Sequence, residues 1–233
     1  PSGSTGMAAQ QKLLEDHLGK LGGKVHRQEF RIQHPSTGEP VAMCNLIAQW
    51  QPERKQRVLL CAHYDTLPYP MLDPVDPEGV FVGANDGGSG VALLMELAHE
   101  LPDLLATDQT EFGVDIVMLD GEEFIFQPRG GRYFWGSEFF ARSYAAGNLP
   151  YQGRYRWGIL LDMIGDADLR IEQEAGSLWW RDTRPLITQI WATARRLRVR
   201  EFVPKKGIEV RDDHVPLHNI GGIPICDLID IDY

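Results

Sequence analysis

The chain has 233 residues, of which 43% are hydrophobic, and its 33 Asp and Glu against 23 Lys and Arg give a formal net charge of −10. This acidic balance argues against a nucleic-acid partner, because nucleic-acid surfaces need clustered basic side chains. No apolar run approaches the roughly 18 residues of a membrane-spanning helix. The length suits a single α/β domain, which we expect to occupy residues 1–233.

The first part of the chain predicts one helix followed by two strands. Residues 7–24, "MAAQQKLLEDHLGKLGGK", have leucines at helical spacing and end at a glycine pair. Residues 25–32, "VHRQEFRI", and residues 41–50, "VAMCNLIAQW", predict two strands. The turn between them, "HPSTGEP", is rich in residues that favour turns.

Four short apolar runs then alternate with helical segments. These runs are "QRVLLCAHYD" (56–65), "VDIVMLDGEE" (114–123), "WGILLDMIGD" (157–166) and "IPICDLID" (223–230). Each is rich in Val, Ile and Leu and too short for a lone helix, which indicates a strand buried on both faces. Helices are predicted at 87–101, after a glycine-rich turn, and at 184–197, with Pro185 near the start. This alternation predicts a largely parallel sheet covered by helices on both sides.

Each of the four runs ends in acidic or histidine side chains. They are His63 and Asp65, then Asp120, Glu122 and Glu123, then Asp162 and Asp166, then Asp227 and Asp230. Because ligands bind at the carboxyl ends of strands in an open α/β sheet, we expect these groups to share one site.

Crowded carboxylates in a crevice must protonate, pair with Lys or Arg, or surround a divalent cation. The cations closest in sequence to these motifs are Arg129, Arg132 and Arg211. Asp and Glu oxygens with one or two His nitrogens suit Zn²⁺, especially where one position stays open for substrate. Of the adjacent Glu122 and Glu123, one can bind the metal while the other faces the substrate as a base.

Two further motifs carry acidic residues next to turns. In "FVGANDGGSG", Asp86 precedes glycines that lead into a helix; it is either an N-cap, worth about 1 kcal/mol, or a metal ligand. Because Asp86 occurs together with the other acidic motifs, we favour the interpretation that it is a metal ligand. In "EVRDDHVPLHN", Asp212, Asp213 and His214 form either a polar loop or a group of residues that orients a catalytic side chain.

The three cysteines predict neither a disulfide nor a metal site. Cys44, Cys61 and Cys226 are far apart, lie in apolar surroundings and form no CxxC motif. We therefore interpret them as small buried hydrophobic residues.

Five motifs, taken in order, resemble the zinc-dependent aminopeptidase family that also contains the glutaminyl-peptide cyclotransferases, or glutaminyl cyclases. They are "AHYDT", "GANDGGSG", "DGEE", "LLDMIGD" and "DDHVP", and the resemblance spans about residues 55–230. It implies a three-layer α/β/α fold with a central mixed, mainly parallel sheet. It also implies a peptide or protein N-terminus as substrate and a secreted or periplasmic location.

The resemblance implies zinc as the cofactor, with one ion in the cyclases and two in the aminopeptidases. Asp86 and Glu123 would be zinc ligands, and Asp86 would bridge both ions in the aminopeptidases. His63 and Asp162 would ligate the second zinc of the two-metal enzymes.

The resemblance also implies the catalytic roles. Glu122 would be the general acid and base. In the cyclases Asp162 would join Glu122 and Asp212 in a proton network, and Asp65 would orient His63.

Several details bear on which branch of the family the chain resembles. The insertion "FIFQPRGGRYFW" before Gly136 and the "DDH" motif are similar to the cyclases, whereas "GGSG" is more peptidase-like and Pro128 stands where cyclases usually have Trp. The family's last metal ligand is a His after the final strand, and the sequence stops at Tyr233 before one, so we expect a truncated sequence.

Our leading hypothesis is a zinc-dependent glutaminyl-peptide cyclotransferase that converts an N-terminal Gln to pyroglutamate and releases ammonia. The alternative is a two-zinc aminopeptidase. A non-catalytic binding module is a third hypothesis, because a fold does not fix a function.

Overall fold

The computed structural model describes residues 1–106, 111–127, 129–150 and 153–232. Pro128 and Tyr233, on which two of the expectations above rest, lie outside these residues. The helices are α1 (Thr5–Lys20), α2 (Gly88–Leu105), α3 (Trp135–Ala145), α4 (Ala175–Trp179), α5 (Arg184–Leu197) and α6 (His214–Asn219). The strands are β1 (Lys24–Gln33), β2 (Pro40–Trp50), β3 (Gln56–His63), β4 (Phe112–Leu119), β5 (Arg154–Asp162), β6 (Ile171–Gln173), β7 (Phe202–Lys206) and β8 (Ile225–Ile229).

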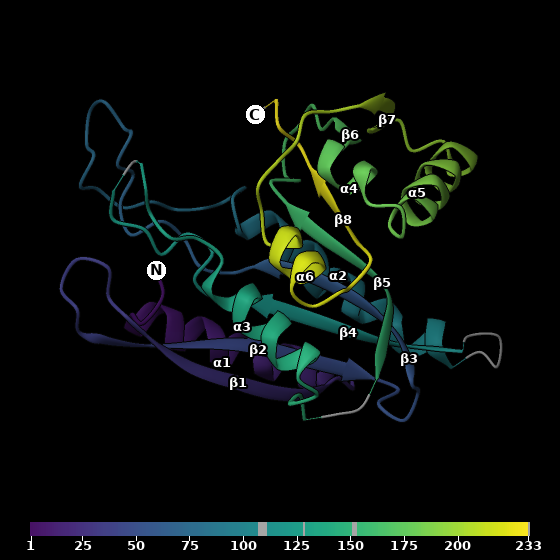
Figure 1. Ribbon diagram of the computed structural model, residues 1–233, viewed down its shortest axis with the longest axis horizontal. Helices are drawn as coiled ribbons and strands as arrows, with labels where there is room; N and C mark the ends of the chain where they lie inside the picture. The colour runs from purple at the N-terminus through teal and green to yellow at the C-terminus, as the bar shows by residue number, and fades with distance from the viewer. Residues whose placement is uncertain (107–110, 128, 151–152, 233) are drawn as a thin grey trace.

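The main sheet has six strands in the order β1-β2-β4-β3-β5-β8 (Figure 1). β1 pairs with β2 and β2 with β4 in antiparallel register, whereas β4, β3, β5 and β8 run parallel to one another. The expectation of a mixed, mainly parallel sheet is therefore confirmed. The short strands β6 and β7 form a separate parallel pair that the sequence pattern did not predict.

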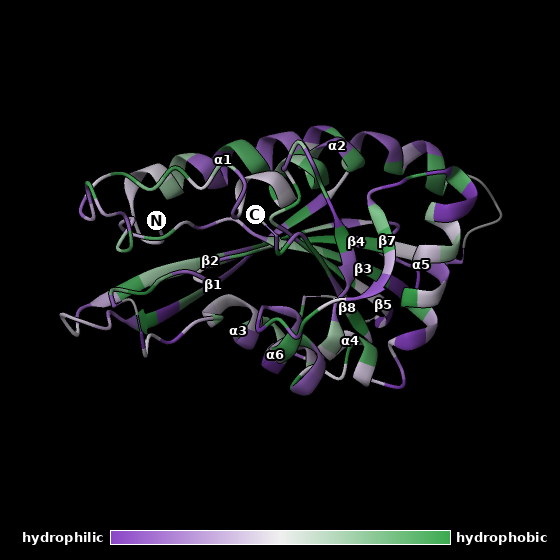
Figure 2. Cartoon of the chain, turned by 90° about the horizontal axis from the view of Figure 1, so that it is seen from above, coloured by the Kyte–Doolittle hydropathy of each residue, from purple (hydrophilic) through white to green (hydrophobic). Residues whose placement is uncertain are grey.

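Helices cover both faces of the sheet. Figure 2 shows α1 and α2 on one side and α3, α4 and α6 on the other. β4 is buried at nearly every position because helices cover both faces of the sheet. Successive residues of a strand point to opposite faces, so Ile116 packs into one core and Val117 into the other.

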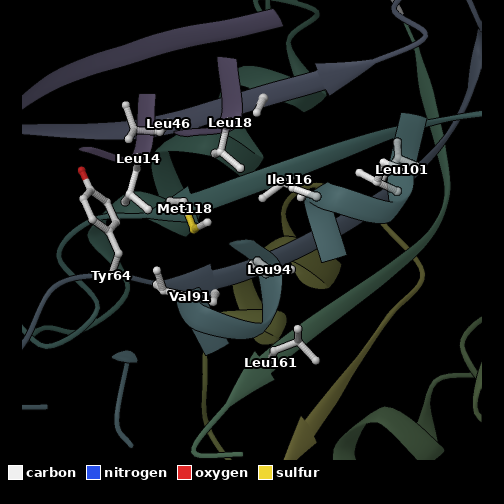
Figure 3. Packing of buried hydrophobic residues seen from close by; sticks show 14 of the residues in the cluster. Leu14, Leu18, Leu46, Tyr64, Val91, Leu94, Leu101, Ile116, Met118 and Leu161 are labelled. Atoms are coloured by element: carbon white, nitrogen blue, oxygen red, sulfur yellow. The ribbon is translucent and has the colours of Figure 1, made fainter. Parts of the chain in front are cut away.

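The larger core lies between the sheet and the α1–α2 layer. Leu14 and Leu18 of α1 are one helical turn apart and are fully buried with Leu94 of α2 against Ile116 and Met118 of β4 (Figure 3). This spacing places one apolar stripe of each helix on the sheet. The packing fixes the sheet, and with it the positions at which the parallel strands end.

The structure agrees with the sequence on the elements that carry the acidic motifs, and it adds three helices, α3, α4 and α6. α3 begins at Trp135, the last residue of the insertion, and α6 occupies residues that one sequence interpretation left as a polar loop. Cys44, Cys61 and Cys226 are buried and free, as expected. In the part of the chain that the structure describes, no helix is long and apolar enough to cross a membrane.

Candidate metal centre

The parallel strands bring the acidic motifs to one edge of the sheet. β3 ends at His63, β5 ends at Asp162, and the segment with Glu122 and Glu123 follows β4. Neighbouring strands end level with each other, since His63 pairs with Leu119 at the end of β4. The structure brings His63 close to Glu122, Glu123 and Asp162. Other acids expected at this edge have different partners: Asp120 accepts hydrogen bonds from Ser2 and the amide of Cys44, Asp166 accepts one from the amide of Asp168, and Asp230 accepts one from the amide of Arg170.

His63 lies at the centre of this group. The side chain is 1% exposed, and Nε2 lies 3.0 Å from Oδ1 of Asp86 and 3.3 Å from Oδ1 of Asp162. Burial lowers the pKa of His63, but contacts with Asp162, Asp65 and Asp86 outweigh it and raise this pKa well above the ordinary value. The imidazole therefore lies in a strongly negative environment.

Asp65 braces the turn that carries the paired glutamates. Its Oδ1 accepts a hydrogen bond from the amide of Glu122 and its Oδ2 accepts one from the amide of Glu123, both at 3.0 Å. The same carboxylate lies 3.7 Å from Nδ1 of His63. Asp65 is thus placed to orient His63, as the resemblance implies, and it also fixes the backbone of the turn.

Burial acts on both glutamates of the pair. Burial, with repulsion from the neighbouring Asp86, raises the pKa of Glu123 to about 9, although His63 opposes this rise. Burial likewise raises the pKa of Glu122 well above its ordinary value, with added repulsion from Asp212 and Asp213. Glu123 also accepts a hydrogen bond from the amide of Leu67 at 3.0 Å. Two carboxyl groups are thus held together in a place that disfavours their charges.

Asp86 is not the N-cap of α2. The cap position is Gly87, and no side chain caps the helix. Gly87 has φ +70°, and a Cβ there would lie 2.9 Å from Cε1 of His63 and from the carbonyl oxygen of Asp65. A glycine is therefore required for Asp86 to approach His63.

The site fits a divalent cation. His63 shares one group of candidate ligand atoms with Asp86 and Asp162 and another with Glu122 and Glu123; within each group the atoms lie within 4.8 Å of one another. Across the described residues, His63 is the basic side chain that forms ion pairs with these acids. The raised pKa values of Glu122 and Glu123 favour protonation in the metal-free chain, and a bound divalent cation would relieve the same repulsion.

The arginines that follow the motifs in sequence are engaged elsewhere. Arg132 pairs with Glu138 at 2.9 Å, and its guanidinium lies 3.8 Å from the ring centroid of Trp135. Arg211 lies 5.5 Å from the ring centroid of Phe134. Neither guanidinium forms an ion pair with the acids at the sheet edge.

The insertion folds back onto the turn of the paired glutamates. The amides of Phe134 and Trp135 donate to the carbonyl oxygens of Glu122 and Gly121, at 3.4 and 3.2 Å. Phe134 is buried and has φ +66°, a conformation that bulky residues rarely adopt. This return of the chain holds α3 against the turn.

Sequence reasoning missed several buried partners of the "DDH" motif. Ser137 at the start of α3 donates to Asp213, while burial raises the pKa of Asp213 to about 7. Glu174 caps α4 and lies 3.5 Å from Nε2 of His214. The serine stands in the Gly-Ser pair after the insertion, but no local signal marked Glu174.

Comparison with known proteins places this geometry in a family. A model of peptidase family M28 matches residues 45–233. A glutaminyl cyclase of Fimbriiglobus ruber shares 40% identity and a TM-score of 0.90 over 100% of this chain and 78% of its own. A Zn-dependent exopeptidase of Parabacteroides distasonis shares 29% identity and a TM-score of 0.85, covering 98% of this chain and 77% of its own.

Similarity to curated sequences is lower but extends along the chain. A glutaminyl-peptide cyclotransferase-like protein of Mus musculus is 25% identical over 248 residues, which cover 98% of this chain and 62% of that protein. The chain thus spans less than two thirds of the length of this relative. Since the family model covers most of the sequence and the solved structures share its fold, the chain belongs to peptidase family M28.

Proposed function

We propose that the chain carries the active site of a zinc-dependent glutaminyl-peptide cyclotransferase, whose substrates are peptides or proteins with an N-terminal Gln. The proposal is supported chiefly by the convergence of Asp86, Glu123 and Asp162 around His63 in a chain that is 40% identical, over its whole length, to a glutaminyl cyclase.

The reaction forms one bond and breaks another. The α-amine nitrogen of the terminal Gln attacks its own side-chain amide carbon, a ring C–N bond forms, and the amide C–N bond breaks to release ammonia. When zinc is bound by Asp86 and Glu123, it supplies a Lewis acid that polarises the amide carbonyl. The remaining chemistry is proton transfer.

Glu122 is placed to carry that proton. It would accept a proton from the attacking amine and deliver it to the leaving ammonia, which is general acid–base catalysis. The amide hydrogen bond to Asp65 holds Glu122 in position, and Asp212 adds to the repulsion that raises its pKa. A carboxyl group with a raised pKa is suited to both accepting and returning a proton.

The substitution Glu122→Gln tests this role. We expect turnover of Gln-peptides to be lost while zinc affinity stays nearly unchanged, because Glu123 keeps its carboxylate. Glu100→Gln, an exposed change on α2, is the matched control and should alter neither. Equal losses of turnover and zinc in Glu122→Gln would contradict the assignment.

One observation favours a second candidate, a two-zinc aminopeptidase. His63, Asp86 and Asp162 form a ligand group of their own, and a solved structure with a similar fold is titled a Zn-dependent exopeptidase. Incubation with Gln-peptides and with amino-acid anilides, each with and without chelator, separates the two activities. The variant His63→Asn should damage a two-metal hydrolase far more than a one-metal cyclase.

A further inference from the structure

A second group of ionisable side chains joins the "DDH" motif to β8. Asp212 precedes α6, His214 begins it, and Asp227 lies in the middle of β8. All three are buried, with exposures of 4, 0 and 1%. One ligand atom from each lies within 4.8 Å of the others. Neither His63 nor Asp86 belongs to this group.

The polar atoms that face each other here form no hydrogen bonds. Oδ2 of Asp212, both carboxylate oxygens of Asp227 and both ring nitrogens of His214 form no hydrogen bond with the described residues. A buried polar group without a partner costs about 1–3 kcal/mol, and a charged one costs more. The imidazole of His214 can balance at most one of the two carboxylates, so a further cation would balance the other.

No Lys or Arg of the described chain forms an ion pair with Asp212 or Asp227; the ion pair found for Asp227 is with His214. The buried Asp115 provides a contrast, because Arg57 donates to its two oxygens from Nε at 3.0 and 2.9 Å. The fold can therefore neutralise a buried carboxylate with a guanidinium, and it does not do so in this group.

The geometry around His214 resembles that of a metal-bound imidazole. Oε2 of Glu174 lies 3.5 Å from Nε2, whereas Oδ2 of Asp227 lies 3.6 Å from Nδ1 on the other side of the ring. Metal-binding histidines commonly direct their second nitrogen at a carboxylate. Glu174 is fixed for this purpose by the amides of Gly176 and Val210, which donate at 2.7 and 2.9 Å.

The spacing also suits a small cation. Zn–N and Zn–O bonds of about 2.0–2.2 Å separate neighbouring ligands of a tetrahedral ion by about 3.4 Å. The 3.6 Å between Nδ1 of His214 and Oδ2 of Asp227 is close to this value. One imidazole and two carboxylates are ligands that Zn²⁺ accepts.

We propose that Asp212, His214 and Asp227 form a second, buried zinc site, separate from the centre at His63 and oriented by Glu174. An ion there would fix α6 against β8 and hold Asp212 at the side of the proposed catalytic Glu122. The proposal does not depend on the reaction, because it rests on the buried atoms of this group that form no hydrogen bond.

The test measures bound zinc in a chain whose first centre has been removed. The double variant Asp86→Asn/Glu123→Gln eliminates ligands of that centre in both its one-ion and two-ion forms. After loading with Zn²⁺ and exhaustive dialysis, we expect mass spectrometry of the metal to find one zinc per chain. Adding His214→Gln should remove it.

His218→Gln is the matched control, because His218 lies on the same helix and pairs with Asp182 at its surface. It should leave the bound zinc unchanged. Circular dichroism checks that each variant is folded, and ¹¹³Cd NMR of the cadmium-loaded double variant provides a second readout, with one resonance expected. No zinc in the double variant, or zinc that persists after His214→Gln, would overturn the proposal. Neither result depends on cyclase activity, so failure here leaves the proposed function standing.

Discussion

Asp65 offers the most direct test of how the candidate site is held together. The substitution Asp65→Asn keeps the size of the side chain but replaces one of its two acceptor oxygens with an NH₂ donor. In the structure both oxygens accept backbone amides, those of Glu122 and Glu123, at 3.0 Å. In the variant, one of these amides faces another donor.

The cost follows from those two bonds. A hydrogen bond to a charged group contributes about 1.5–3 kcal/mol, and a buried amide left without an acceptor adds a penalty of similar size. Asp65 is 1% exposed, so water does not replace the lost acceptor. We expect the free energy of unfolding to fall by about 3 kcal/mol and zinc affinity to fall by about 10–100-fold, the range for residues that orient metal ligands.

Urea unfolding in the presence of chelator measures the first effect, and competition with a chromophoric chelator measures the second. Asp73→Asn is the control: Oδ1 of Asp73 also accepts two amides, at 2.7 and 3.1 Å, but on an exposed loop. If Asp65→Asn matched this control in both stability and zinc affinity, the bracing role of Asp65 would be refuted.

Three further changes test other parts of the fold. Gly87→Ala should lower zinc affinity in the chelator assay, since the new Cβ would lie 2.9 Å from Cε1 of His63 in a left-handed conformation that costs about 1–2 kcal/mol. Arg57→Met should destabilise the chain by about 3–5 kcal/mol in urea, because Asp115 stays buried without its cation, and adding Asp115→Leu should recover most of the loss. Burial would raise the pKa of Glu174, but the contact with His214 and hydrogen bonds from Ser177 and Val210 outweigh it and hold this pKa at about 2, below the ordinary 4.5. The difference is worth about 3 kcal/mol at neutral pH. This stability is present above pH 4.5 and lost as pH falls toward 2, so Glu174→Gln should destabilise at pH 7 but not at pH 2 in thermal unfolding.

The sequence predicted the strands that carry the site because their signal is local. An apolar run that ends in histidine or acidic side chains, as at His63 or Glu123, marks both a buried strand and the edge where it stops. Parallel pairing then brings these ends together without further information. The same reasoning predicted Asp162 at the carboxyl end of a strand, although β5 begins three residues before the predicted run.

Contacts between distant segments were beyond such reasoning. The amides of Glu122 and Glu123 are 57 and 58 residues from Asp65, and Glu174 meets a histidine of another element. The choice between N-cap and ligand for Asp86 also depended on backbone geometry, since Gly87 takes the cap position with positive φ. The strands β6 and β7, with three and five residues, are too short to show a periodic pattern.

The two ends of the sheet treat buried carboxylates differently, and this difference connects the fold to its chemistry. Near the amino ends of the parallel strands, Asp115 receives Arg57 and the hydroxyl of Tyr155, so its charge is balanced permanently by the chain. At the carboxyl ends, repulsion from Asp86 helps to raise the pKa of Glu123 to about 9, and no guanidinium of the described residues pairs with either acid. A permanent ion pair would make the apo protein more stable, but it would also cancel the field that attracts a cation. The unpaired acids therefore lower the stability of the metal-free fold and, by the same interactions, raise its affinity for zinc, since binding one dication relieves all of the repulsion at once.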